Sequence, residues 1–118
     1  MKYGRFLAAL SAFGLAIIRH AEAQEPGALD AYLRTFSALE RCVVTYSGKF
    51  AATQESPNDI ATAAISACSQ EGSAFYVAII GMGRIIGDPD VVMERFKGSL
   101  RNSAIETVLE KRYPNVQK

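Results

Sequence analysis

The sequence predicts an all-α fold: a disulfide-stapled antiparallel helical hairpin plus a third helix, a three-helix bundle preceded by a signal-peptide helix. Apolar residues recur at helical spacing on both sides of Glu55–Asp59, a stop-and-restart signal for a helix. Cys42 and Cys68 lie equally far from residue 55, where this signal begins. Since residues equidistant from the turn face each other in an antiparallel hairpin, we expect the two thiols to lie level. A second restart signal, Asp88-Pro89, predicts the third helix.

Residues 1–23 have the pattern of a secretory signal peptide. A short basic segment precedes a largely apolar run of 13 residues, 6–18, and Ala21-Glu22-Ala23 supplies the small residues that a signal peptidase needs. The run is shorter than the ~20 residues of a membrane-spanning helix. We therefore expect cleavage after Ala23, no stable membrane insertion afterwards, and a single helical domain, residues 24–118, exported to the periplasm or the medium.

Cleavage would change the charge and remove the only histidine, His20. Residues 1–23 hold three basic residues and one acidic residue, which leaves ten basic and eleven acidic residues, a net charge of −1. Such a chain has no cationic field to attract nucleic acid. Without histidine, Ser-His-Asp and Cys-His nucleophile pairs and histidine-ligated metal or haem sites are excluded. No carboxylate pair or lysine base has a recognisable spacing, so we predict no enzyme, cofactor or metal.

The two cysteines predict one structural disulfide. Export to an oxidising compartment favours pairing of Cys42 with Cys68. Two free buried thiols are the alternative. The 25 intervening residues bear no relation to the C-x-x-C motif of redox proteins. The bond is therefore expected to hold the scaffold and to perform no chemistry.

Each predicted helix has a start signal and an apolar stripe. The first begins near Pro26, and its stripe alternates spacings of 3 and 4: Leu29, Tyr32, Phe36, Leu39, Val43, Tyr46 and Phe50. The second begins with Ser56 as N-cap and Pro57 as the first helical residue, and residues 70–73 are its weak point. Its stripe consists of Ala61, Ile65, Cys68, Gly72, Phe75, Ile79, Met82 and Ile86. The third runs from Asp88-Pro89 until Tyr113-Pro114 stops it.

The segment 74–80 is apolar on every face, which is typical of a helix buried on several sides. A β-strand is the alternative, but no second strand-like run exists to pair with it. Two neighbouring helices leave part of this segment uncovered, and an exposed remainder indicates a contact surface. The candidate interaction surface consists of Phe75, Val77, Ile79, Ile80, Met82 and Ile86.

The function best supported by these patterns is a non-enzymatic protein-interaction module, with an unknown protein partner or as a homodimer. Residues 60–70, Ile60-Ala61-Thr62-Ala63-Ala64-Ile65-Ser66-Ala67-Cys68-Ser69-Gln70, resemble the segment around the second cysteine of HdeA-type periplasmic acid chaperones. That resemblance implies an alternative function, a stress chaperone that exposes apolar surface at low pH. A further alternative is an inhibitor of a secreted hydrolase, for which the turn at 55–59 is the candidate loop.

Overall fold

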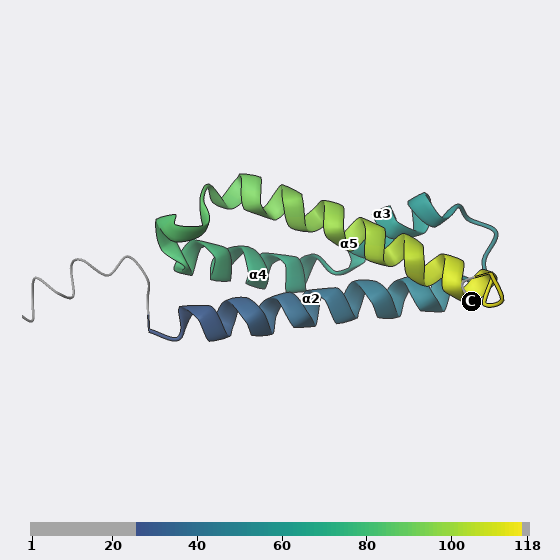
Figure 1. Ribbon diagram of the computed structural model, residues 1–118, viewed down its shortest axis with the longest axis horizontal. Helices are drawn as coiled ribbons and strands as arrows, with labels where there is room; N and C mark the ends of the chain where they lie inside the picture. Colours follow the sequence, from purple (N-terminus) through teal and green to yellow (C-terminus); the bar gives the residue numbers. More distant parts are fainter. Residues whose placement is uncertain (1–25, 117–118) are drawn as a thin grey trace, which may run out of the picture.

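The structure, a computed structural model, describes residues 26–116, and the predicted signal peptide lies outside these residues. The described chain is helical and contains no strand (Figure 1). Its elements are α2 (Ala28–Phe50), α3 (Pro57–Ala67), α4 (Ser69–Gly81), the short 3-10 helix η1 (Gly83–Ile86) and α5 (Pro89–Arg112). The predicted all-α class is therefore confirmed for this part of the chain.

Local signals set most helix ends. Ser56 caps α3 by accepting a hydrogen bond from the Asp59 N–H at 3.1 Å, and Pro57 is the first helical residue. Asp88 caps α5 in the same way and Pro89 follows it. The first helix begins two residues later than predicted, because Gly27 takes a left-handed conformation with φ of 76° and so lies outside the helix.

The predicted second helix is two helices. We expected one continuous helix with a weak point at residues 70–73, but α3 ends at Ala67, α4 begins at Ser69, and the backbone changes direction at Cys68. Gly72 lies inside α4. The physical reason is a change of neighbour: α3 packs mainly on α5, whereas α4 packs mainly on α2. A straight helix could not follow both neighbours. We call α3 and α4 together the return arm.

The disulfide joins this break to the middle of α2. The Cys42–Cys68 bond is present, with the two Cα atoms 6.0 Å apart. Cys68 is fully buried, and Cys42 is half-buried against the same apolar core. The predicted staple is therefore confirmed, and it fixes the point at which the return arm changes its neighbour.

The core is richest in aromatic rings at one end. Tyr32 and Phe36 of α2, Phe75 of α4 and Phe96 of α5 form one cluster, with ring centroids of contacting pairs 5.0–6.1 Å apart. Phe75 is fully buried in this cluster. Since the four rings come from three helices, the cluster fixes how α2, α4 and α5 pack against one another.

The opposite end is held by Arg112, the last residue of α5. Its Nε donates a hydrogen bond to the carbonyl oxygen of Ala51 at 2.7 Å. Its Nη2 donates to the carbonyl oxygens of Thr53 and Glu55 at 2.7 and 2.6 Å. The guanidinium thereby satisfies three carbonyls of the turn between α2 and α3, which a helix end and a short turn otherwise leave unpaired.

Candidate functional site

The predicted interaction surface is divided between the core and the solvent. Phe75 and Ile79 are fully buried and Met82 nearly so, and Ile86 packs against the same core. The prediction that Phe75, Ile79 and Met82 belong to the surface is therefore wrong, because α2 and α5 cover the side of α4 on which Phe75 and Ile79 lie. Ile86 is half-buried. The two remaining predicted residues are exposed: Val77 by 66% and Ile80 by 52%.

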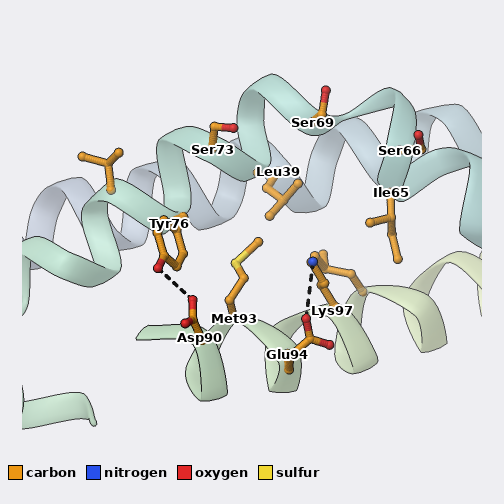
Figure 2. Close-up of a pocket in the computed structure, with 13 residues that line it drawn as sticks. Leu39, Ile65, Ser66, Ser69, Ser73, Tyr76, Asp90, Met93, Glu94 and Lys97 are labelled. Atoms are coloured by element: carbon orange, nitrogen blue, oxygen red, sulfur yellow. Dashed lines mark hydrogen bonds and ion pairs between the residues drawn. The ribbon is translucent and has the colours of Figure 1, made fainter. Parts of the chain in front are cut away.

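A groove opens next to Val77, between the return arm and α5 (Figure 2). Its volume is about 620 Å³, and binding sites for small molecules commonly measure roughly 300–1,000 Å³. Its apolar floor consists of Leu39, Ile65, Met93 and Leu100. The return arm contributes Ser66, Ser69, Gly72, Ser73, Tyr76 and Val77, and α5 contributes Asp90, Glu94 and Lys97. We call this site the α4–α5 groove.

Small residues on the return arm keep the groove open. Ser66, Ser69, Gly72 and Ser73 line it, and none has a side chain long enough to reach α5. At Gly72, a Cβ atom would lie 3.9 Å from Cε of Met93, an ordinary van der Waals distance. Figure 2 shows Leu39, Ile65 and Met93 pointing into the space between the helices. The groove is therefore a place where the packing of α5 on the return arm is incomplete.

Polar contacts join the two walls near both ends of the groove. At one end the Tyr76 hydroxyl donates a hydrogen bond to Oδ1 of Asp90 at 2.8 Å (Figure 2). Toward the other, Nη1 of Arg101 donates to Oδ1 of Asn58 at 2.8 Å and to Oγ1 of Thr62 at 2.9 Å. These bonds join α5 to the return arm on either side of the groove.

Along the α5 wall, acidic side chains lie toward the start of the helix and basic side chains lie further along it. Lys97 pairs with Glu94 at 3.4 Å, and Arg101, one turn further on, is bound to Asn58 and Thr62. Asp90, at the other end, has a neutral phenol as its hydrogen-bond partner and no basic group within ion-pair distance in residues 26–116. The groove therefore has an apolar floor and a carboxylate at one end whose charge no neighbouring cation neutralises.

The same carboxylates raise the pKa of the Tyr76 phenol above its ordinary value of 10.0. The hydrogen bond to Asp90 is the largest cause, followed by desolvation and by the negative charges of Asp90 and Asp88. The protonated phenol is the form favoured in the folded chain. Its stabilising contribution is therefore complete below the unfolded pKa of about 10 and is lost as the pH rises through the higher folded value.

Exchange of Asp90 for asparagine should lower the pKa of Tyr76 toward 10.0, because it removes the nearer negative charge and weakens the hydrogen-bond acceptor. The difference in ultraviolet absorbance between the protein and its Tyr76→Phe variant, followed over alkaline pH, isolates this phenol. Asp59→Asn is the control, since Asp59 also lies in the first turn of a helix but is not in the groove. An unchanged Tyr76 titration in Asp90→Asn would show that the carboxylate is not the cause.

A group of three potential metal-ligand atoms also occurs in the described residues. The ligand atoms of Cys42, Cys68 and Glu71 lie within 4.8 Å of one another. Both sulfur atoms are joined in the disulfide, so neither is available as a thiolate. This group is therefore explained by the staple.

Of the residues predicted from the sequence as an interaction surface, only Val77 lines the groove. The signal that the sequence analysis missed is a row of small polar residues and one tyrosine, Ser66, Ser69, Ser73 and Tyr76, at spacings of 3, 4 and 3. This row places one polar stripe along residues 66–76 of the return arm, beside its apolar stripe. Only the position of α5 shows that the row lines a groove and does not simply face the solvent.

Comparisons with models of protein families, with curated proteins and with solved structures find no match for this chain. Within residues 26–116, none of the helices has the length and hydropathy needed to cross a membrane.

Proposed function

We propose that this protein is an exported, non-enzymatic interaction module that associates with a second copy of itself. The supporting observation is the position of its exposed apolar side chains. Six large ones belong to four elements that meet at one end of the molecule (Figure 1): Leu29, Leu33, Val77, Ile80, Ile85 and Val91. We call this the η1 end.

The distribution of exposed apolar side chains along the molecule supports a contact surface at the η1 end. Single exposed apolar residues are normal on any protein, but their accumulation in one region is typical of interaction sites. At the other end, by contrast, the exposed large apolar residues of the described chain are Tyr113 and Val116, both beyond the end of α5. A symmetric dimer formed through the η1 end would bury the same side chains on both copies.

The disulfide and the N-terminal segment support export. A buried Cys68 bonded to Cys42 requires an oxidising compartment for its formation. The N-terminal 23 residues have the pattern that directs a chain there. Removal of this segment leaves no histidine for acid–base catalysis, which supports a role in binding.

Sedimentation equilibrium of residues 24–118 over a wide concentration range tests the proposal. We expect a monomer–dimer equilibrium that Ile80→Lys shifts toward monomer by at least tenfold, because a lysine at the centre of an apolar interface must be desolvated. Tyr113→Lys is the matched control, since it places the same charge at a similarly exposed apolar position at the opposite end. A strict monomer at high concentration, or an equal effect of both substitutions, would contradict self-association through the η1 end.

A further inference from the structure

We propose that the α4–α5 groove binds a small amphipathic cation, a molecule with an apolar body and an ammonium group. Its apolar body would lie against Leu39, Met93 and Leu100, and its ammonium group against the carboxylate of Asp90. The groove shares Val77 with the η1 end, but the other residues of that end such as Ile80 and Ile85 lie outside the groove, so the two proposals can be tested separately.

The floor of the groove fits an apolar body. Leu39 and Leu100 are almost completely buried, so they form a firm base, while Met93 is half-buried and has a flexible side chain that adapts to a ligand. The serines and the glycine on the return arm add little bulk. An apolar group placed here would fill the space between α4 and α5 and remove their apolar atoms from water.

The charges favour a cation over an anion. Lys97, which lines the groove, pairs with Glu94, and Arg101 donates to two polar side chains of α3. Arg95 lies beside Asp90 and Glu94 without forming an ion pair with either. Asp90 has no ion-pair partner in residues 26–116, and the negative charge of Asp88 acts on the same phenol, Tyr76. An ammonium group at this end would gain a charge-assisted hydrogen bond to the carboxylate of Asp90.

The site also gives a ligand one orientation. Asp90 precedes Lys97 by seven residues, which is about 10 Å along a helix. A cation at the Asp90 end is therefore kept away from the ammonium group of Lys97. Its apolar body extends toward Ile65, where the floor of the groove continues.

The test is a titration of oxidised, isotope-labelled residues 24–118 with octylammonium, followed by the amide signals of Gly72, Ser73 and Met93 in NMR spectra. Octanoate and octanol serve as probes with the same chain and a negative or neutral head. We expect octylammonium to bind about fivefold more tightly than octanoate, the difference that an exposed ion pair commonly makes. Tighter binding of octanoate, or no saturable shift at these three residues, would overturn the proposal.

Two matched pairs of variants locate the ligand. Gly72→Leu fills the groove and should weaken binding of octylammonium at least tenfold, whereas Gly98→Leu makes the same exchange at an exposed position of α5 outside it. Circular dichroism checks that both variants fold, and Ser69→Leu replaces Gly72→Leu if that variant does not fold. Binding that survives the filled groove would overturn the proposal.

The second pair tests the charge. Asp90→Asn should make octylammonium and octanoate bind equally, while Asp59→Asn, which removes a carboxylate from the first turn of α3, should keep the fivefold preference. A preference retained in Asp90→Asn would overturn the assignment of the ammonium group to this carboxylate. Since Ile80→Lys is expected to leave octylammonium binding unchanged, the failure of self-association and the failure of the groove are distinguishable.

Discussion

The Cys42→Ala/Cys68→Ala double variant is expected to lose about 3.5 kcal/mol of the free energy of unfolding. The bond has a sequence separation of 26 residues, and the chain-entropy relation gives about this value for a loop of that length. It also connects α2 to the break between α3 and α4, where no continuous helix holds the backbone. The midpoint of thermal unfolding should fall by roughly 15–25 °C.

Denaturant unfolding followed by far-ultraviolet circular dichroism measures this loss. Ser69→Ala is the control, because Ser69 begins α4 beside the bridge but its exposed side chain takes no part in it. The control should change the free energy of unfolding by less than about 0.5 kcal/mol. A loss below about 1 kcal/mol in the double variant would mean that the bond adds little to a hairpin already held by its apolar contacts.

Phe75→Ala is expected to cost about 3–5 kcal/mol, the usual result of truncating a buried phenylalanine. Phe75 is fully buried and contacts the rings of Tyr32, Phe36 and Phe96 with centroids 5.4, 5.3 and 5.0 Å away. Alanine would leave a cavity where three helices meet. Equilibrium unfolding in urea gives the loss directly.

Val77→Ala is the matched control for Phe75→Ala. Val77 lies two residues further along α4, but its side chain is 66% exposed, so its truncation should cost less than about 0.5 kcal/mol. Comparable losses in the two variants would show that α4 is rotated about its axis relative to the structure described above.

The helix ends could be predicted because their causes are local. Ser56 with Pro57, and Asp88 with Pro89, each place a side-chain cap directly before a proline that suits the first turn. Tyr113-Pro114 ends α5 because the residue before a proline disfavours helical geometry. These signals act within a few residues, so the sequence alone is enough to predict where these helices begin and end.

The break at Cys68 and the buried face of α4 could not be predicted in the same way. The sequence shows weak helix formers at Gly72 and Ser73, but the helix breaks earlier, where the return arm leaves α5 and meets α2. In α4, apolar residues such as Phe75, Val77 and Ile80 occur around the whole helix, so no stripe marks the side facing the core. Both features depend on tertiary contacts.

The candidate site depends on tertiary contacts more than any other feature. Val77 was predicted as a surface residue because segment 74–80 is apolar on every face and two neighbouring helices leave part of it uncovered. The groove beside it requires the relative position of the return arm and α5. From the sequence, Asp90 is expected to be an ordinary acidic residue in the first turn of a helix, where it stabilises the helix N-terminus. Its hydrogen bond to Tyr76, fourteen residues earlier, gives it a second role at the end of the groove.

The most direct test of an exported, stapled helical protein is the intact mass of the exported chain, alkylated under denaturing conditions without reduction. We predict a chain that begins at Gln24, lacks two hydrogen atoms because Cys42 and Cys68 are bonded, and carries no alkyl group. An exported chain that retains residues 1–23 would contradict cleavage after Ala23, and one that carries an alkyl group on each cysteine would contradict the staple.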